Sequence, residues 1–441
     1  MRTSPMLRLG IMGLLMFMLL VPLAMIYSVV SERETRRNAV TGEISDEAGG
    51  AQTVGGPVLV IPYRYTSVDN QGRSRSLMAY MSVLPDLLRI DGQVEPEIRR
   101  RALFPVIVYR AHLKISGRVS RPDLSHVRPA PEEVLWDDAM LSVGVSDPKG
   151  ISRRLEANIG GQTRPFVPGV SDVGLFSTGV QAPAAGPLTA DSQGVTFSLE
   201  LDLNGTRELR FLPAGHETTV QLSSTWPHPS FVGAPLADER RVDRDGFSAT
   251  WRVPYFGRGY PPIWTSASQN REQLMAQAAA SAFGVTLVQP VDIYLQTERA
   301  VKYAVLFIVL TFVIAFLWEI TGGVLLHPVQ YVFLGFTMCV FYLLLLSLSE
   351  HTGFDAAYLI ASAATVTLLS KYWSWVLRAA KGAWLMGAAL SLLYGYLYLL
   401  LRLEDYALLA GSIGVFLALA IVMFLTRRVN WYELRLGATG L

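Results

Sequence analysis

Residues Val285–Glu319 read VTLVQPVDIYLQTERAVKYAVLFIVLTFVIAFLWE and contain two different periodicities. In the first half, apolar residues alternate with polar or proline positions, a period near two that predicts a β-strand; these residues are Leu287, Val291, Ile293 and Leu295. The second half, Val301–Trp318, has a single charge at Lys302 and is long enough to enter a bilayer as a helix. The two patterns meet at Glu298–Ala300, so we expect a folded water-soluble body to run into a membrane helix almost without a linker.

The composition of the 441-residue chain indicates a membrane protein with a substantial water-soluble part. Hydrophobic residues make up 51% and charged residues 17%, whereas about a quarter of the residues in a typical soluble protein are charged. The charges gather in residues 31–298, and residues 299–441 are mostly apolar. The sequence has no cluster of basic residues that could bind phosphates, so a nucleic-acid partner is not expected. The single cysteine, Cys339, excludes an intramolecular disulfide and a cysteine-based metal site.

The N-terminal residues 1–30 are expected to be an uncleaved transmembrane anchor. Gly10–Val30 contains no charged residue and follows two basic residues, Arg2 and Arg8. The apolar region of a cleaved signal peptide spans about 7–15 residues and ends at a small-residue cleavage site, whereas this run is longer and lacks such a site. A cleaved signal peptide is the competing interpretation.

Residues 31–298 are expected to form one large, β-rich and mainly antiparallel domain. Apolar residues alternate through Thr196–Leu212, and the central Asn204-Gly205 pair predicts the tight turn of a hairpin. A charged stalk, a Gly/Pro-rich surface loop and a helix are expected at Ser31–Ala51, Pro165–Gly194 and Arg271–Phe283 respectively.

The C-terminal part is expected to be a five-helix bundle over residues 299–426, followed by a cytoplasmic tail at 427–441. Together with the first anchor this gives a six-transmembrane-helix bundle, with the β-rich domain inserted between helices 1 and 2. The five expected spans are Val301–Trp318, Val329–Leu348, Phe354–Ser370, Lys381–Leu401 and Tyr406–Thr426.

The distribution of lysine and arginine in the short loops predicts the orientation of the chain. One set of loops and termini is basic and is therefore expected in the cytoplasm; it contains Arg2, Arg8, Lys371, Arg378, Lys381, Arg427, Arg428 and Arg435. The opposite loops are mostly acidic. We therefore expect both termini in the cytoplasm and the large domain in the periplasm of a bacterial inner membrane.

The segment Trp226-Pro227-His228-Pro229-Ser230-Phe231 is the most unusual part of the expected periplasmic domain. Two prolines restrict the backbone around a histidine, and aromatic residues lie on either side. One interpretation is a rigid interaction loop that uses Trp226, His228 and Phe231. The competing interpretation is a structural turn whose aromatic side chains cap the sheet.

Small residues recur at intervals of four in the last two expected spans. Such spacing lets helix backbones approach closely in lipid. The candidates for helix packing are Gly387, Ser391, Gly395 and Gly414. Packing within the bundle is one interpretation, and the seam of a homo-oligomer is the other.

Charged residues near the expected spans suggest two roles. The residues Glu319, His327, Glu350 and His351 fall at span ends, which indicates boundary residues rather than the ion path of a pumping transporter. The charged residues at the strand-to-helix junction are candidates for coupling the domain to the bundle; they are Glu298, Arg299 and Lys302.

No enzymatic motif is visible in the sequence. The expected periplasmic domain has histidines only at His112, His126, His216 and His228, without the spacing of a metal site such as HExxH. A GxSxG nucleophile elbow and a phosphate-binding glycine loop are also missing. We therefore predict no catalytic residue, no metal site and no cofactor, and a protein that is not an enzyme.

Several segments together resemble one family, the bacterial inner-membrane protein CreD. They are SSTWPHPSFVG (223–233), GFSATWRV (246–253), FGVTLVQPVDIYLQTERAVKYAVLFIVLTF (283–312), HPVQYVFLGFTMCVFYLLLLSLSEHTGFDAAYL (327–359), EDYALLAGS (404–412) and LTRRVNWY (425–432). The resemblance covers most of residues 195–432 and is loose over residues 31–190. It implies a Gram-negative inner-membrane protein of the cell envelope. It also implies expression under a two-component, CreBC-like stress regulator and effects on β-lactam response and colicin tolerance. It supplies no catalytic residues.

These observations favour a non-enzymatic envelope-stress protein that maintains cell-envelope integrity through its periplasmic domain. Its expected partners are the lipid bilayer and envelope proteins or cell-wall components that the sequence does not identify; self-association is an open alternative. A transporter that binds a lipid or a cell-wall fragment is a second hypothesis. A polytopic periplasmic hydrolase is a third, and it requires His228 or carboxylates to converge in a cleft.

Overall fold

The structure is a computed structural model in which the chain forms two compact units. It describes residues 5–68, 73–171, 174–187, 192–268, 270–289, 292–322, 326–377, 380–403 and 406–427. The helical unit comprises Met1–Asn38 and Val291–Leu441, and the β-rich unit comprises Ala39–Pro290. The chain is therefore a mixed α+β protein with large sheets and long apolar helices, as the sequence predicts at this coarse level. The unit boundaries lie eight residues away from the expected ones at 30/31 and 298/299.

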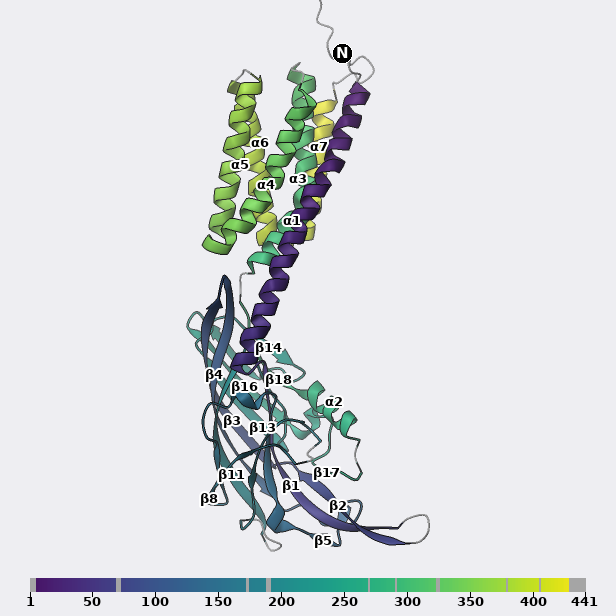
Figure 1. Cartoon of the computed structure of the whole chain (residues 1–441), viewed down its shortest axis with the longest axis vertical. Coiled ribbons are helices and arrows are strands. Elements are labelled where there is room, and N and C mark those ends of the chain that lie inside the picture. Colours follow the sequence, from purple (N-terminus) through teal and green to yellow (C-terminus); the bar gives the residue numbers. More distant parts are fainter. Residues whose placement is uncertain are drawn as a thin grey trace, which may run out of the picture. The chain divides into compact units, whose positions relative to one another are not determined.

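Helix α1 (Pro5–Ala48) is one unbroken helix, drawn in purple in Figure 1. It joins the apolar run Gly10–Val30 to the charged stalk, because no glycine pair or helix-terminating proline separates them. The helix ends at Gly49-Gly50, where both residues have positive φ angles of 91° and 60°. Glycine adopts this left-handed conformation without steric penalty, which is why helices commonly end at glycine.

The β-rich unit contains two large sheets. The strands of the ten-stranded sheet are β1 (Gln52–Val68), β2 (Ser74–Val83), β5 (Glu133–Val134), β6 (Met140–Val145), β9 (Val167–Pro168), β10 (Gly179–Pro183), β12 (Glu208–Phe211), β14 (Pro229–Gly233), β17 (Ile263–Thr265) and β18 (Phe283–Leu287). Their main order is β14-β18-β12-β1-β6-β10-β9, with β2, β5 and β17 attached through β1 and β2. Strand β1 pairs in parallel with β12 and antiparallel with β2, β5 and β6.

The second sheet has eight strands in the order β15-β16-β13-β3-β4-β11-β7-β8. They are β3 (Leu87–Arg101), β4 (Phe104–Ser120), β7 (Glu156–Ile159), β8 (Gln162–Pro165), β11 (Gly194–Thr206), β13 (Glu217–Ser224), β15 (Glu239–Asp243) and β16 (Gly246–Pro254). Every pairing is antiparallel except β13 with β3. Short helices join the strands: η1 (Leu124–His126), η2 (Trp136–Asp138), η3 (Pro148–Gly150), η4 (Tyr255–Gly257) and α2 (Arg271–Ser281).

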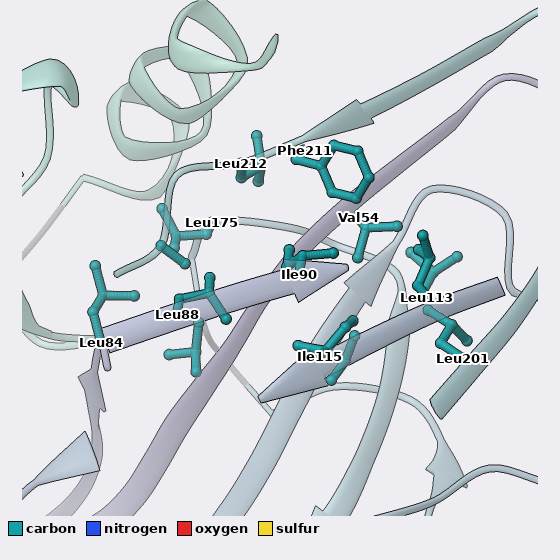
Figure 2. Close-up of a cluster of buried hydrophobic side chains, with 14 of the residues drawn as sticks. Val54, Leu84, Leu88, Ile90, Leu113, Ile115, Leu175, Leu201, Phe211 and Leu212 are labelled. Atoms are coloured by element: carbon teal, nitrogen blue, oxygen red, sulfur yellow. The ribbon is translucent and has the colours of Figure 1, made fainter. Parts of the chain in front are cut away.

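One hydrophobic core lies between the two sheets (Figure 2). Val54 and Phe211 come from the ten-stranded sheet, and they share the core with Ile90, Leu113 and Leu201 of the eight-stranded sheet. The alternation of apolar and polar residues along β11 explains why one face of this strand lies in the core. Residues 197, 199, 201 and 203 are buried, while the intervening residues are exposed or half-buried. This period of two is what a strand with one buried face requires.

Two expectations about connections in this domain are wrong. Thr196–Leu212 is not a hairpin, because β11 continues through Gly205 to Thr206 and pairs with β4, whereas β12 belongs to the other sheet. Gly205 lies in the strand, where a Cβ atom would come within 2.4 Å of the Tyr109 hydroxyl, and the chain turns at Arg207 with φ 59°. The expected surface loop 165–194 contains β10, which pairs with β6 and buries Ala182.

The expected strand-to-helix junction also differs from the structure. Strand β18 ends at Leu287 and helix α3 (Ile293–Gly322) begins eight residues before the expected start at Val301. Residues 288–292 therefore separate strand from helix, and Val291 lies outside the described residues. Ile293 and Leu295, which alternate with less apolar residues, lie in the first turn of α3. Over so few residues, a helix start that contains polar residues can show the same alternation as a strand.

Among its described residues, the helical unit contains α1 up to Asn38 and five further helices. They are α3, α4 (Pro328–Thr352), α5 (Phe354–Leu377), α6 (Ala380–Arg402) and α7 (Ala407–Thr426). Helix α4 begins with a capping box: the His327 ring accepts from the Val329 N–H, and Gln330 accepts from the His327 N–H. Such reciprocal bonds satisfy the free donors of a helix start.

Within the described residues, five helices are long and apolar enough to cross a membrane. They are Gly10–Ala48, Ile293–Ile320, Pro328–Thr352, Trp384–Arg402 and Ala407–Thr426. Helix α5 coincides with the expected span Phe354–Ser370 but is not among the five. The prediction of six spans is therefore not confirmed. The prediction of a membrane protein with several transmembrane helices is confirmed.

Candidate functional site

A cluster of charged and tyrosine side chains lies where α1, α3 and α4 meet in the helical unit. We call it the helix-end cluster. Its members are Tyr27, Arg33, Glu34 and Arg37 of α1, Asp292 just before α3, Tyr294, Glu298 and Lys302 of α3, and Glu350 of α4. It joins segments more than 250 residues apart in the sequence.

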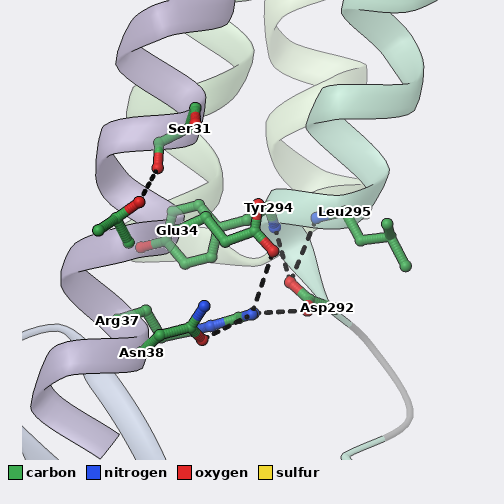
Figure 3. Close-up of polar contacts among 8 residues, drawn as sticks. Ser31, Glu34, Arg37, Asn38, Asp292, Tyr294 and Leu295 are labelled. Carbon is green, nitrogen blue, oxygen red and sulfur yellow. Dashed lines mark hydrogen bonds and ion pairs between the residues drawn. The ribbon is translucent and has the colours of Figure 1, made fainter.

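Asp292 links the start of α3 to α1 (Figure 3). One carboxylate oxygen accepts from the backbone N–H groups of Tyr294 and Leu295 at 3.0 and 3.2 Å. The other oxygen pairs with Arg37 Nη1 at 2.5 Å. A carboxylate at this position satisfies free donors of the helix start and interacts favourably with its dipole. The side chains of Arg37 and Asp292 are only 23% and 31% exposed, so solvent screens this pair less than a surface ion pair.

Tyr294 connects the same region to α4. Its hydroxyl donates to Glu350 Oε1 at 3.1 Å, and the Arg37 guanidinium lies 5.5 Å from the centre of its ring. The carboxylate of Glu350 is 8% exposed and lies 3.9 Å from Arg33 Nη1. A buried carboxylate needs such partners, because leaving its charge unpaired costs several kcal/mol. Glu350 is therefore a member of this cluster rather than only a boundary residue.

The predicted coupling residues lie in α3, at least one helical turn after its first residue. Glu298 accepts from the Tyr27 hydroxyl at 2.9 Å and pairs with Lys302 Nζ at 3.0 Å. Glu298 and Lys302 are four residues apart, the spacing at which helical side chains meet. Arg299 is half-buried. These contacts fasten α1 to α3, and a role in coupling stays a prediction.

In the β-rich unit, Gln52 fastens the start of β1. Its side chain is fully buried, and Nε2 donates to the carbonyls of Gly49, Asp147 and Asn204 at 2.5, 3.1 and 3.1 Å. Its Oε1 accepts from Ser146 Oγ at 3.1 Å and from the Asp147 N–H at 3.2 Å. One amide thus binds three separate segments of the chain directly after the end of α1.

Close backbone packing surrounds this amide. A Cβ atom on Gly49 would lie 2.8 Å from Gly150 Cα, and one on Gly150 would lie 2.4 Å from the Asn204 carbonyl oxygen. Only glycine fits at both positions without moving the backbone. The end of α1 is therefore held rigidly within the β-rich unit.

The predicted interaction loop is largely part of the ten-stranded sheet. Phe231 lies in β14 and its ring makes edge contacts with Phe247 and Trp251, both at 5.8 Å between ring centres. Trp226 is half-buried and its indole N–H donates to the Val288 carbonyl at 3.0 Å. His228 is exposed. Trp226 and Phe231 thus make the contacts expected of a structural turn whose aromatic side chains cap the sheet. A binding role for this segment stays a prediction.

The predicted helix-packing residues divide into two groups. A Cβ atom on Gly387 would lie 2.6 Å from Ser370 Oγ of α5, and one on Gly414 would lie 2.1 Å from the Tyr396 hydroxyl of α6. Those glycines permit close contact between helices. By contrast, Gly395 has no atom within 4 Å of its Cβ position, and Ser391 is exposed.

Polar groups also lie inside the helical unit. Glu319, expected at a membrane boundary, is 2% exposed and accepts from the Tyr331 hydroxyl at 2.8 Å. The Tyr358 hydroxyl donates to the Tyr394 carbonyl at 2.6 Å. In the described part of the chain, the buried hydroxyl of Tyr342 has no hydrogen-bond partner. An isolated hydroxyl in an apolar interior is unfavourable and calls for an explanation.

Histidines and carboxylates do not form a metal centre in the described ranges, where no group of three or more possible ligands converges. His112 of β4 lies close to two carboxylates, those of Asp202 and Glu95. Its Nδ1 lies 2.5 Å from Asp202 Oδ1, and Arg153 Nε lies 3.0 Å from the other oxygen of Asp202. His228, which the hydrolase hypothesis uses, lies on a different strand connection.

The sequence matches the family described as "Inner membrane protein CreD" over residues 4–432. It is also 33% identical to the inner membrane protein CreD of Escherichia coli (strain K12) over 430 residues, which are 95% of this chain and 92% of that protein. The chain belongs to the CreD family. The relative's name and the apolar helices together assign this CreD-family chain to the inner membrane.

Solved structures show a much weaker likeness to this CreD-family protein. Two structures of the M1 zinc metallopeptidase from Deinococcus radiodurans are 13% and 14% identical, with TM-scores of 0.22 and 0.20. The match covers 40% of this chain and 41% or 40% of those chains. A likeness of this size carries no inference about function.

The sequence reasoning missed most of the helix-end cluster. The segment Asp292-Ile293-Tyr294 carried a signal, because an aspartate directly before a helical segment is a common cap. The partners Arg37 and Glu350 carried none beyond their place near span ends. Gln52 and the buried Arg258 also gave no local signal, since burial of a polar side chain depends on contacts that are remote in the sequence.

Proposed function

We propose that this CreD-family protein is a non-enzymatic envelope-integrity protein. In this proposal the β-rich unit lies in the periplasm and binds envelope proteins or cell-wall components, while the helical unit holds it in the inner membrane with both termini in the cytoplasm. Expression under a CreBC-like two-component regulator, an effect on β-lactam response and colicin tolerance belong to the same proposal. Membership of the family supports it.

One structural observation carries the proposal: polar contacts lie near the chain ends of each unit, at the start of β1 within the β-rich unit and at the start of α3 within the helical unit. At the first of these places, α1 runs unbroken to Ala48 and the buried Gln52 amide binds three carbonyls. At the second, Asp292 caps α3 and pairs with Arg37. A pure membrane anchor requires only a flexible linker. Polar contacts of this kind in each unit support a role in which binding to the β-rich unit acts on the membrane helices.

The test is complementation of a gene deletion under envelope stress. We expect the deletion to alter envelope permeability and β-lactam sensitivity, and the wild-type gene to restore both. A variant with a Gly/Ser linker inserted after Gln289 should insert into the membrane but fail to restore them. An insertion after Thr297 would be unsuitable, because this residue is buried within α3.

The control variant has the same linker between Arg244 and Asp245, in the exposed turn between β15 and β16. It should complement fully. Unchanged permeability and sensitivity in the deletion strain would refute the envelope role. Full complementation by the Gln289 insertion would leave the envelope role intact but show that the connection is only a tether.

A second candidate function is a membrane protein that binds or moves a lipid or a cell-wall fragment. The buried carboxylate of Glu319 and the unpartnered hydroxyl of Tyr342 favour it, since ionisable and polar groups inside apolar helices are costly and often functional. Mass spectrometry of the detergent-solubilised protein tests it. A specific lipid that co-purifies with the wild-type protein but not with the Glu319→Gln variant would support lipid binding.

A further inference from the structure

Arg258 is a buried cation in the β-rich unit, in the connection between β16 and β17. It follows the short helix η4, and only 7% of the residue is exposed. Its Nη1 group donates to the backbone carbonyls of Ala214 and Gly215, both at 3.0 Å. These two bonds hold one end of the guanidinium against the connection between β12 and β13.

The other edge of the guanidinium is free. Arg258 Nε and Nη2 are buried and have no hydrogen-bond partner among the described residues. The faces of the group are covered by aromatic rings: the centres of the Tyr255 and Tyr260 rings lie 5.8 and 5.5 Å from Cζ. No ion pair in the described part of the chain involves Arg258, and burial lowers its pKa. A buried charge without an anion is strongly unfavourable.

The geometry of the free edge indicates which anion would fit. The N–H bonds of Nε and Nη2 point in the same direction and form the fork that binds the two oxygens of a carboxylate or phosphate. In Arg258 the Nη1 group is already used by the backbone, so this fork is both fixed in position and unoccupied. Fixing a binding group in advance lowers the entropy cost of binding.

Aromatic side chains lie close to the guanidinium: the half-buried Tyr255 ring contacts it, and the exposed His216 and Phe256 rings contact Tyr255. The Tyr255 ring stacks on the ring of His216 at 5.0 Å with an interplanar angle of 12°. The neighbouring Phe256 is 84% exposed, and its ring centre lies 4.5 Å from that of Tyr255. A largely exposed phenylalanine is typical of an interaction site when polar recognition groups lie next to it.

We propose that the Nε–Nη2 edge of Arg258 binds a carboxylate, and that an apolar part of the same ligand lies on Phe256 and Tyr255. A single guanidinium matches the charge of a carboxylate, whereas a phosphate dianion would call for additional donors. The C-terminal carboxylate of a peptide has this combination of a charge and adjacent small apolar groups. Entry requires movement of η4, which Phe256 does not oppose because its side chain is free of the core. The site goes beyond the envelope role and holds whether or not that role is correct.

The test uses the full-length protein in detergent and three probes: N-acetyl-alanyl-alanine, its C-terminal amide, and inorganic phosphate. Isothermal titration should show saturable binding of the free acid, and the melting temperature should rise with its concentration, since a ligand that binds only the folded state stabilises it. The amide should do neither. Arg258→Lys keeps the charge but loses the fork, so it should weaken binding of the acid at least tenfold.

The matched control is Arg241→Lys, at an exposed arginine of β15, which should bind like the wild type. Phe256→Ala serves where Arg258→Lys fails to fold, because this exposed side chain supports little of the core; it should weaken binding of the acid without lowering the melting temperature of the free protein. Equal binding of acid and amide, or binding unchanged in both variants, would overturn the proposal. A response to phosphate alone would overturn the assignment of a carboxylate.

Discussion

At the scale of single residues, buried polar side chains decide how this chain is held together. Gln52, Tyr260 and Tyr331 each satisfy a backbone or side-chain group that would otherwise be buried without a partner. Tyr342 has a hydroxyl for which the described residues offer no partner. Removing a bonded group leaves its partner unsatisfied, whereas removing an unbonded group does not. The two cases give opposite predictions.

We predict that Gln52→Leu destabilises the β-rich unit by about 3 kcal/mol, because one buried and two part-buried carbonyls lose their donor while the volume is kept. The measurement is chemical or thermal unfolding of the purified protein, followed by tryptophan fluorescence. Gln221→Leu, the same change at an exposed position of β13, is the control and should have little effect. Equal stability of the two variants would contradict the role assigned to Gln52.

A second prediction compares two tyrosines of α4. Tyr331→Phe removes the bond to Glu319 and should lower stability by about 1–3 kcal/mol. Tyr342→Phe removes a buried hydroxyl without a partner and should be neutral or stabilising. Both changes remove one oxygen from the same helix, so thermal melts in one detergent compare them directly. A clear loss of stability in Tyr342→Phe would mean that its hydroxyl is bonded, for instance by a lipid or an internal water.

A third prediction concerns alkaline pH. Burial raises the pKa of Tyr260 from 10.0 to about 12, and its hydroxyl donates to the Pro213 carbonyl at 2.9 Å. A pKa that is higher in the folded than in the unfolded state favours folding at low pH. This contribution should be complete below pH 10 and disappear as the pH rises toward 12. Unfolding midpoints measured between pH 8 and 12 should fall mainly above 10, and the fall should be smaller in Tyr260→Phe.

At the scale of elements, the residues that end a helix or strand set the direction in which the chain continues. The pair Gly49-Gly50 ends α1 and directs the chain into β1. Arg207, with φ 59°, ends β11 and directs the chain from one sheet into the other. Helix α7 meets α6 where the Tyr396 hydroxyl donates to the Ala410 carbonyl and Gly414 leaves space for the ring. The contact of these two helices therefore depends on the absence of a side chain.

We predict that Gly414→Leu separates α7 from α6 and lowers stability by about 1–3 kcal/mol, as overpacking does in tight interfaces. Gly395→Leu is the matched control, because its Cβ would meet no atom within 4 Å. Melting temperatures in detergent test the pair. Size-exclusion chromatography with light scattering adds a second measurement. A change of oligomeric state in Gly395→Leu would show that the exposed face of α6 around Gly395 lies in an interface between copies of the chain.

At the scale of the whole molecule, the chain consists of a β-rich unit whose two ends continue into apolar helices. Its two sheets share one core, so the unit does not depend on the membrane for its hydrophobic burial. The basic short loops support the cytoplasmic side for both termini. These features make the orientation of the chain accessible to a direct chemical test.

We predict that the β-rich unit is accessible from the periplasm. Cys339→Ala removes the single cysteine, and new cysteines are placed at Arg241 of β15 or at Trp375 of α5, both exposed. A membrane-impermeant maleimide should label the cysteine at 241 in cells with a permeabilised outer membrane. It should label the cysteine at 375 only after the inner membrane is opened. The reverse pattern would show the opposite orientation.

The sequence alone determined the coarse division of the chain into a β-rich and a helical part, the apolar segments on which the long helices lie, and the family. These properties follow from hydrophobic periodicity and length, which each segment carries locally. The sequence singled out Glu298 and Lys302 only as candidates for coupling at the junction, and the structure shows that they form an ion pair within α3. Only the tertiary structure decided that β12 lies parallel to β1, that Arg37 meets Asp292, and that Gln52 and Arg258 are buried. Those contacts join residues that are remote in the sequence, and no local pattern encodes which distant backbone will satisfy a polar group once water is excluded.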